Sequence, residues 1–259
     1  MNTQNIENLF RILSVHDDDG TSRRHAALTL GSTRGEGIAE RLVEAIAAEP
    51  DAHVREDLTW AIVQHAEAAE PHLLDMLTSD DHNRRFTAAH VLSKVGNPDH
   101  FEHVAPLVAD EQKDVALKAY RAAANTGGSR AVDVLAARLG DGDDWQRDAL
   151  STAMSTLGAD AVPALVQALS DGDAGVREHA AEALGHMGGP EADGAAEALE
   201  KSATDSEAAV RLMAVSALGQ LGFVADEPLR RLSSSEDTTV AAVAKRFVAE
   251  REAADSAAG

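Results

Sequence analysis

Histidine and carboxylate side chains at helical spacing are the residues of this sequence with the most obvious potential chemistry. His100 and His103 lie three residues apart with Glu102 between them, and His179 and Glu182 share that spacing. On a helix, either pair would present two metal ligands on one face. A stable site needs at least three ligands, and neither pair supplies a third. Because the chain has 11 histidines, we interpret these pairs as surface histidines and expect no metal site and no cofactor.

The acidic and glycine-rich stretches give no catalytic motif either. Asp17, Asp18 and Asp19 could chelate a cation, but a helix start explains this run without a ligand. The sequence contains no glycine-rich phosphate loop, no nucleophile elbow and no pair of catalytic carboxylates. We therefore expect a protein that is not an enzyme.

Composition and charge restrict the possible partners. The 259 residues include 44 Asp and Glu against 23 Lys and Arg, which gives a formal net charge of −21. Such a field repels phosphate backbones and anionic membrane surfaces, so we expect no nucleic-acid partner and no membrane partner. The sequence has no Cys, which excludes disulfides and thiolate metal sites. We find no signal sequence and no apolar run of about 18 residues, and expect a monomeric, cytoplasmic protein.

The kind of charge indicates adaptation to salt. Only five of the basic residues are Lys, Asp outnumbers Glu, and Ala replaces larger apolar residues. Short carboxylates hold water where salt competes for it. We expect the cytoplasm of a halophilic archaeon, with an ordinary acidic protein as the alternative.

The elements that position these residues follow from an internal repeat of about thirty residues, the period of a helical solenoid. The clearest copy, from Asp173 to Gly188, reads Asp-Ala-Gly-Val-Arg-Glu-His-Ala-Ala-Glu-Ala-Leu-Gly-His-Met-Gly. Its arginine recurs in six copies, and Ala116 and Ala241 take its place in two more, so eight copies fit the chain. An acid stands four positions before each arginine. These pairs are Asp19 and Arg23, Asp51 and Arg55, Asp81 and Arg85, Asp143 and Arg147, Asp173 and Arg177, and Glu207 and Arg211.

This ladder of acids and arginines has a structural interpretation. An acid at a helix start accepts backbone N–H bonds, and the arginine one turn later can pair with that acid or with the acid of the next copy. Exposed pairs contribute about 0 to 1 kcal/mol each, so we expect the ladder to set register more than stability. Glycines eleven positions past the arginine, such as Gly158 and Gly188, are expected to end the helices.

Segments with helical apolar spacing lie between these helices and predict a first helix for each copy. Pro106 falls late in one of them and is expected to kink it. The sequence thus predicts an all-α protein, an α-solenoid with a right-handed superhelix of about eight two-helix repeats over residues 1–248, followed by a frayed tail over 249–259. The first helices are predicted at residues 3–15, 36–48, 68–78, 99–109, 130–139, 159–169, 191–203 and 226–233.

The repeated pattern Asp-x-x-x-Arg-x-x-Ala-Ala-x-Ala-Leu-Gly-x-x-Gly resembles the HEAT-like repeat of the phycobilisome lyase type. The resemblance covers nearly the whole chain and implies the solenoid fold. Proteins of this type include lyases that attach bilin chromophores, a di-iron deoxyhypusine hydroxylase, relatives of DNA glycosylases, and adaptors, some of them in archaeal signalling. The hydroxylase would need His-Glu dipeptides, which are absent here. The glycosylases would need a basic face, against which the net charge argues.

Two positions of each second helix are predicted to face the inner surface of the solenoid, one and five residues past the arginine. In the second to fourth copies they hold aromatic, apolar and cationic side chains, which are typical of a binding surface. We predict that the partner-binding residues are Trp60, Phe86, His90, Leu117 and Arg121, with Tyr120 and Trp145 close by. Rotating these helices by one position would instead bury Trp60 and Phe86 in the core, and the sequence leaves this alternative open.

Two functions fit this surface. The first is a non-catalytic interaction scaffold or adaptor that binds a protein on its concave face, for example in archaeal signalling or chemotaxis. The second is an enzyme or subunit of the bilin-lyase type, which would bind a tetrapyrrole in the same groove. In that case Arg121 or Arg147 would pair with propionates, and His90 or Tyr120 would assist proton transfer.

Overall fold

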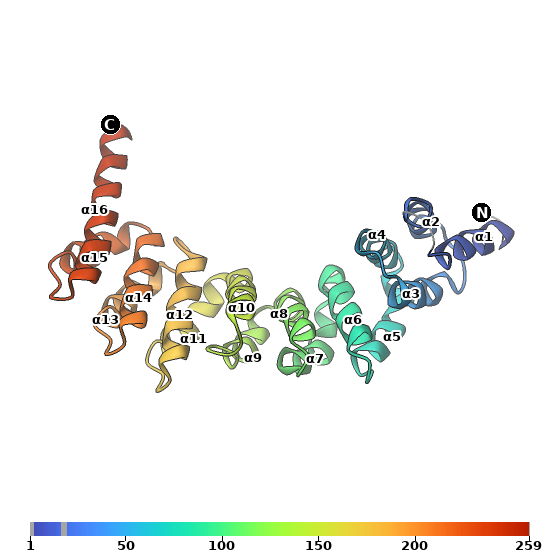
Figure 1. Ribbon diagram of the computed structural model, residues 1–259, viewed down its shortest axis with the longest axis horizontal. Coiled ribbons are helices and arrows are strands. Elements are labelled where there is room, and N and C mark those ends of the chain that lie inside the picture. The colour runs from blue at the N-terminus through green and yellow to red at the C-terminus, as the bar shows by residue number, and fades with distance from the viewer. Residues whose placement is uncertain (1–2, 17–19, 259) are drawn as a thin grey trace. The chain divides into compact units, whose positions relative to one another are not determined.

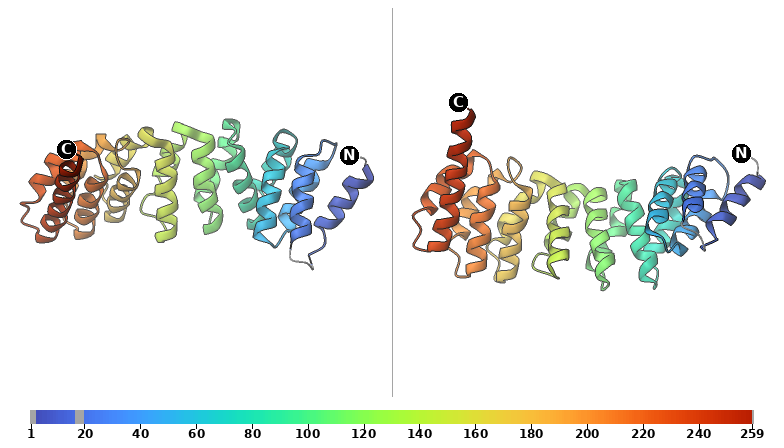
Figure 2. Two further views of the ribbon diagram at one scale, coloured as in Figure 1. Left: turned by 90° about the horizontal axis from the view of Figure 1, so that it is seen from above. Right: turned by 45° about the horizontal axis from the view of Figure 1, so that its top comes forward.

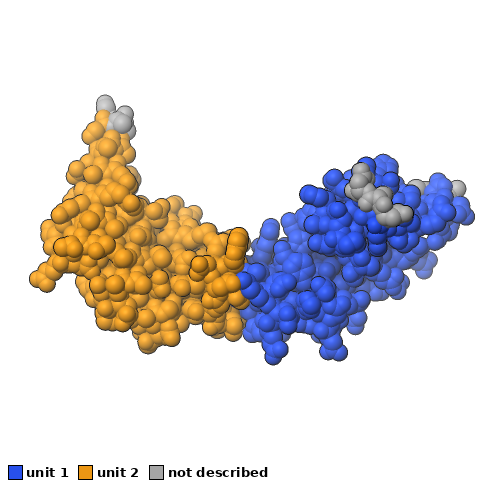
Figure 3. All heavy atoms as spheres, in the orientation of Figure 1, with its two compact units in different colours: residues 1–126 blue, residues 127–259 orange. Residues whose placement is uncertain are grey.

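The structure, a computed structural model, describes residues 3–16 and 20–258, and over these ranges every regular element is a helix (Figure 1). The chain is an α-solenoid built from two-helix repeats, as the sequence predicts. It divides into two compact units, residues 1–126 and 127–259, which are coloured separately in Figure 3. Each unit contains four of the eight predicted repeats. We describe the N-terminal unit and the C-terminal unit one at a time.

In the N-terminal unit the second helices α2, α4, α6 and α8 alternate with first helices. The elements in chain order are α1 (Thr3–Leu13), α2 (Thr21–Gly31), α3 (Ile38–Ala48), α4 (Ala52–Val63), α5 (Ala66–Leu77), α6 (His82–Val95), η1 (Pro98–His100), α7 (Phe101–Val104), η2 (Ala105–Ala109) and α8 (Lys113–Gly127). The fourth first helix is broken into three short pieces, and Pro106 lies in the last of them. The predicted kink at Pro106 is confirmed, because proline lacks the N–H that a continuing α-helix needs.

The C-terminal unit repeats this arrangement, and each of its first helices begins with a 3₁₀ turn. Its elements are η3 (Gly128–Ala131), α9 (Val132–Ala136), α10 (Asp144–Leu157), η4 (Gly158–Ala161), α11 (Val162–Ala168), α12 (Ala174–Met187), η5 (Asp193–Ala195), α13 (Ala196–Ser202), α14 (Ala208–Gln220), η6 (Phe223–Ala225), α15 (Asp226–Leu232) and α16 (Thr238–Ala258). The second helices α10, α12, α14 and α16 contact one another in series and lie side by side (Figure 2).

Small residues let consecutive second helices approach closely. Ala180, Ala181 and Ala183 of α12 are fully buried between neighbouring helices. A Cβ added at Gly31 of α2 would lie 2.8 Å from the Cα of Ala61 on α4. Such a contact is too short for any side chain, so glycine is required where the helix backbones come this near.

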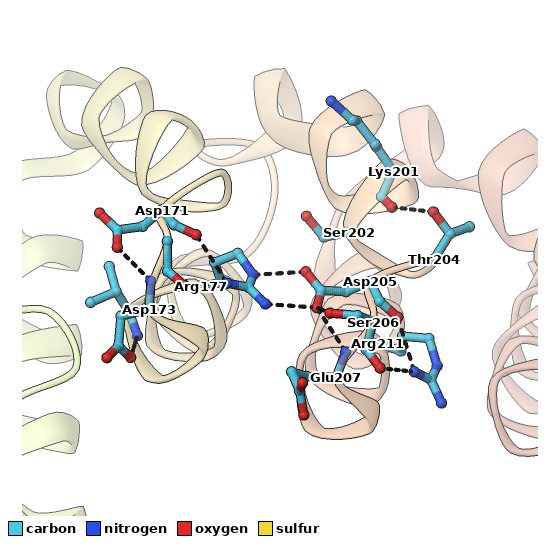
Figure 4. Close-up of polar contacts among 12 residues, drawn as sticks. Asp171, Asp173, Arg177, Lys201, Ser202, Thr204, Asp205, Ser206, Glu207 and Arg211 are labelled. Carbon is cyan, nitrogen blue, oxygen red and sulfur yellow. Dashed lines mark hydrogen bonds and ion pairs between the residues drawn. The ribbon is translucent and has the colours of Figure 1, made fainter.

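The ladder arginines connect consecutive repeats. The Arg177 guanidinium donates through Nε and Nη2 to both carboxylate oxygens of Asp205 in the next repeat, at 2.8 and 2.9 Å (Figure 4). Its Nη1 donates to the backbone oxygen of Asp171, at 2.9 Å. Asp205 in turn accepts the backbone N–H of Glu207 at the start of α14. The hydrogen bonds from Arg177 hold the pKa of the Asp205 carboxyl below its usual range.

The same arrangement recurs with other partners. Arg85 bonds Asp110 at 2.7 Å, Arg211 bonds Asp237 at 2.8 Å, and Arg23 bonds Glu49 at 2.9 Å. Both side chains of the Arg23 and Glu49 pair are at most 3% exposed. A buried pair of this kind leaves an uncompensated charge when one partner is lost, so it specifies register strongly.

The sequence allows two roles for each ladder acid, which are capping its own helix and pairing with an arginine. Asp51, Asp81, Asp143 and Asp173 accept N–H bonds at the starts of their own helices. Pairing within a repeat is wrong for Asp51, Asp81 and Asp173, because the arginine one turn later bonds other oxygens in each case. Glu207 makes no side-chain cap, and Asp19 lies outside the described residues.

Two arginines depart from the ladder. Arg55 donates to the backbone oxygens of Glu49 and Pro50. In the next repeat, Ser79 stands where other repeats have the bonding acid. Its hydroxyl accepts the backbone N–H of Asp81. Arg147 instead approaches Glu178 and Glu182 on α12, at 3.7 and 3.2 Å. Both departures change the charge of the surface that the second helices present.

The C-terminal residues differ from the predicted frayed tail. α16 continues as a helix to Ala258. Arg251 on this helix donates to the backbone oxygens of Gly219, Leu221 and Gly222, and to Asp226 at 2.7 Å. These bonds attach α16 at Arg251 to the preceding repeat.

Residues Asp144–Ala168 are long and apolar enough to cross a membrane by length and composition alone. In the structure, Gly158, with a φ of 60°, separates this stretch into α10 and α11. It therefore forms two helices of the solenoid and not one continuous rod.

Candidate functional site

The second helices of the N-terminal unit carry the predicted binding residues on one surface. Trp60 on α4 is 41% exposed, Phe86 and His90 on α6 are half-buried, Leu117 on α8 is half-buried, and Arg121 is exposed. Trp60 and Phe86 are therefore not core residues, and the alternative in which these helices are rotated by one position is wrong. The Trp60 ring packs on Gly31, where an added Cβ would lie 2.7 Å from Cζ3.

Two adjoining hollows make this surface a groove. One, of about 420 Å³, is lined by Leu28, Trp60 and Val63 together with Glu56 and Lys94 among others. The other, of about 180 Å³, shares Glu56 and Thr59 with the first. It extends to Arg55, Phe86, His90 and Lys118. We call the surface of these two hollows the groove.

The groove holds a mixed set of charges. His90 Nε2 lies 3.1 Å from a carboxylate oxygen of Glu56, and Lys94 Nζ lies 3.5 Å from the other. Burial lowers the pKa of His90, as does the nearby Lys118, so the imidazole is neutral at pH 7 and donates its Nε2 hydrogen to Glu56. Burial raises the pKa of Glu56, but His90 and Lys94 outweigh it and hold that pKa below its usual range.

Two further predicted binding residues, Tyr120 and Trp145, differ in exposure. Tyr120 is 1% exposed and belongs to the core, so its assignment to the binding surface is wrong. It stands four positions past Ala116, and the matching positions in other repeats, Ala27, Ala89 and Ala181, are also buried. Trp145 is 77% exposed, but it lies at the start of α10 in the C-terminal unit.

The inner positions of the C-terminal unit have a different chemistry. At the positions one and five past the arginine, its second helices hold no aromatic residue. These positions are Asp148, Thr152, Glu178, Glu182, Leu212, Ser216, Ala242 and Arg246. Arg147 lies against Glu178 and Glu182. The aromatic and cationic groove is therefore a property of the N-terminal unit and not of the repeat itself.

Comparison with known proteins agrees with this architecture. The family model for HEAT repeats matches residues 70–155 and 147–219, which together exceed half of the chain. The chain belongs to the HEAT repeat family. No curated protein sequence matches this HEAT-repeat protein.

Several solved structures are similar to it. Kap121p bound to the extreme C-terminus of the protein phosphatase Cdc14p has a TM-score of 0.62 at 13% identity, over 95% of this chain and 32% of Kap121p. The chain thus spans about a third of Kap121p. Human deoxyhypusine hydroxylase has a TM-score of 0.41 at 19% identity, over 96% of each chain. The complex of CpcE and CpcF of phycocyanin lyase from Nostoc sp. PCC7120 has a TM-score of 0.43 at 20% identity, over 95% of this chain and 94% of that one.

One histidine from each candidate metal pair, His100 and His179, makes contacts inside the fold of this HEAT-repeat protein. Among the described residues, no group of three or more His, Asp or Glu side chains is arranged to hold a metal ion. His100 is buried, with Nε2 3.3 Å from a carboxylate oxygen of Glu70. His179 is fully buried, donates from Nε2 to the backbone oxygen of Arg147 at 3.0 Å, and accepts the Gly140 N–H at Nδ1. The interpretation of His100 and His179 as surface histidines is therefore wrong.

The exposure of Trp60 and the burial of Tyr120 predict different costs of truncation. Tyr120→Ala should lower the free energy of unfolding by about 3 to 5 kcal/mol, because it empties a core position. Trp60→Ala should lower it by no more than about 2 kcal/mol, because much of the indole is already in water. Chemical denaturation of both variants measures the difference. Equal losses would place Trp60 in the core and contradict the groove.

His179 makes stability depend on pH. Burial lowers its pKa to about 4, from 6.5 in the unfolded chain. The fold thus favours the neutral ring, and its full stability is present above about pH 6.5. As the pH falls from 6.5 to 4, the unfolded chain takes up the proton first, and up to about 3 kcal/mol is lost.

The variant His179→Gln should flatten this pH dependence, measured as the free energy of unfolding from denaturant titrations. His186→Gln alters an exposed histidine of the same helix and should leave the dependence unchanged. A wild-type slope in the His179 variant would show that another group is responsible.

Proposed function

We propose that this HEAT-repeat protein is a non-catalytic scaffold that binds a protein partner in the groove of its N-terminal unit. The observation that carries the proposal is the exposed Trp60 beside Leu28, which is also 41% exposed, in a hollow of about 420 Å³. Adjacent exposed apolar side chains surrounded by charged groups are typical of the centre of a protein interface, where a few anchors supply most of the binding energy.

The fold supports the same proposal. Kap121p, which has this fold, is described in complex with the extreme C-terminus of the protein phosphatase Cdc14p. A HEAT solenoid can therefore bind a segment of another protein. We extend the proposal to a cytoplasmic adaptor in signalling or chemotaxis of a halophilic archaeon; the net charge of −21 and the scarcity of Lys support the halophilic source alone.

The tetrapyrrole alternative loses two of its expected residues. Tyr120 is buried and cannot assist proton transfer in the groove, and Arg147 lies against Glu178 and Glu182. Arg121 and His90 remain for that alternative. Mixing the protein with a free bilin tests it directly, since binding in the groove would shift the absorption of the chromophore.

Site-specific photocrosslinking in source cells tests the scaffold. A benzoyl-phenylalanine at Leu28 places the reactive group in the groove, and one at the exposed Asp75 on α5 serves as the matched control. We expect one protein adduct from Leu28 and none of that protein from Asp75. Adding Trp60→Ser should lower the adduct yield about tenfold, the effect of losing roughly 1.4 kcal/mol from a central anchor.

The proposal fails if the adducts from Leu28 and Asp75 are the same, or if Trp60→Ser leaves the yield unchanged. Melting curves of each variant ensure that the folded protein is compared.

A further inference from the structure

Cations without a carboxylate partner gather along the groove. Arg55 bonds backbone oxygens alone, and neither Lys118 nor Arg121 has an ion-pair partner within the part of the chain that the structure describes. In a protein with 44 acids and 23 bases, most cations have an acid available. Three unpaired cations on one surface therefore call for a physical explanation.

The carboxylates of the groove are already engaged. Glu56 lies against His90 and Lys94, and Asp57 accepts a bond from Arg24 at 2.6 Å. Neither is free to neutralise Arg55, Lys118 or Arg121. Arg55 and Phe86 also line an adjoining hollow, which Asp81 and Asp114 make acidic on its other side.

Lys118 shows how the surface is arranged to receive an anion. Its Nζ lies 5.2 Å from the centre of the Phe86 ring, and its side chain is half-buried. Burial lowers the pKa of this ammonium, and the neighbouring Arg121 charge lowers it further. Glu56 opposes these effects only in part, and a carboxylate from a partner would supply further opposite charge.

The chemistry of the groove favours a peptide over a polyphosphate. Trp60, His90 and Lys118 lie within their helices and not at the N-terminal ends that would cradle phosphates. Apolar anchors beside separate cations match the alternation of side chains in a protein segment.

We propose that the groove binds an acidic peptide segment of the partner protein, with carboxylates paired to Arg55, Lys118 and Arg121 and a large apolar side chain against Trp60. This inference rests on the proposed scaffold function and specifies the chemistry of the partner. It gives the departure of Arg55 from the ladder a role, because the absence of an acid at Ser79 leaves that arginine available to the partner.

Labelled peptides test the inference on the full chain. The acidic probe is a short peptide with a central Leu flanked by Glu residues, the basic probe replaces each Glu by Lys, and a third probe replaces the Leu by Ser. Fluorescence anisotropy should show saturable binding of the acidic probe, weaker binding of the Ser probe and no binding of the basic probe.

Charge reversal locates the binding. The double variant Lys118→Glu with Arg121→Glu should bind the acidic probe about tenfold more weakly. The matched control, Lys201→Glu with Lys245→Glu, makes the same change of charge at exposed lysines of the C-terminal unit and should bind as the wild type does. Circular dichroism of both variants confirms that they are folded.

Each other outcome overturns the inference. Equal losses in the two double variants would mean a general charge effect, and tighter binding of the basic probe or of a single-stranded oligonucleotide would mean a different ligand class. A protein adduct at Leu28 together with failure of the acidic probe would overturn the inference alone and leave the scaffold function standing. Absence of both the Leu28 adduct and the binding of the acidic probe would overturn the inference and the scaffold function together.

Discussion

One interaction organises this solenoid: an arginine near the start of a second helix, such as Arg23, Arg85, Arg177 or Arg211, bonds a backbone oxygen of its own repeat and a carboxylate of the next. Arg177 with Asp205 shows it most completely. A planar guanidinium can satisfy both partners at once because its donors are fixed in a fork. Small residues such as Gly31 and Ala181 then allow the helix backbones to pack closely around that register. Electrostatics thus fixes which repeats meet, and apolar packing supplies most of the stability.

The sequence predicted the repeat architecture well and the partners of the ladder less well. The period of Arg and Gly located eight helix pairs, and the predicted first helix at 36–48 matches α3 at Ile38–Ala48. Choosing between two nearby acids was harder. The bonding acid Glu49 or Asp205 stands two residues before the helix cap, whereas Asp237 is both the cap and the bonding acid.

The candidate site was predicted in part for a similar reason. Positions one and five past the arginine correctly placed Trp60, Phe86 and Arg121 outside the core. Tyr120 is misplaced because its position four past Ala116 belongs to the buried set. No sequence pattern indicated that His179 would bridge Gly140 and Arg147, since those contacts join residues 32 and 39 positions apart. The 3.6-residue period predicts which face of a helix carries a residue, but not its hydrogen bonds to residues distant in the sequence.

The departures from the ladder separate structure from function. Where Arg177 has its acid, the cation is used within the solenoid. Arg55 lacks one because Ser79 replaces it, and the fourth repeat has Ala116 in place of the arginine. These two changes fall in the unit that carries the groove, whereas the departure of Arg147 and the alanine at Ala241 fall in the C-terminal unit. In a fold held by internal ion pairs, an arginine is available to a partner only where no acid of the solenoid pairs with it.

A double-mutant cycle tests the central claim most directly. The coupling between Arg177→Ala and Asp205→Ala, measured from free energies of unfolding, should be about 1 to 2 kcal/mol, because the two residues join consecutive repeats through two charged hydrogen bonds. The cycle of Arg177→Ala with Asp173→Ala, the acid of the same helix, should give about 0.5 kcal/mol or less. Equal coupling in the two cycles, or none between Arg177 and Asp205, would contradict a register set between repeats.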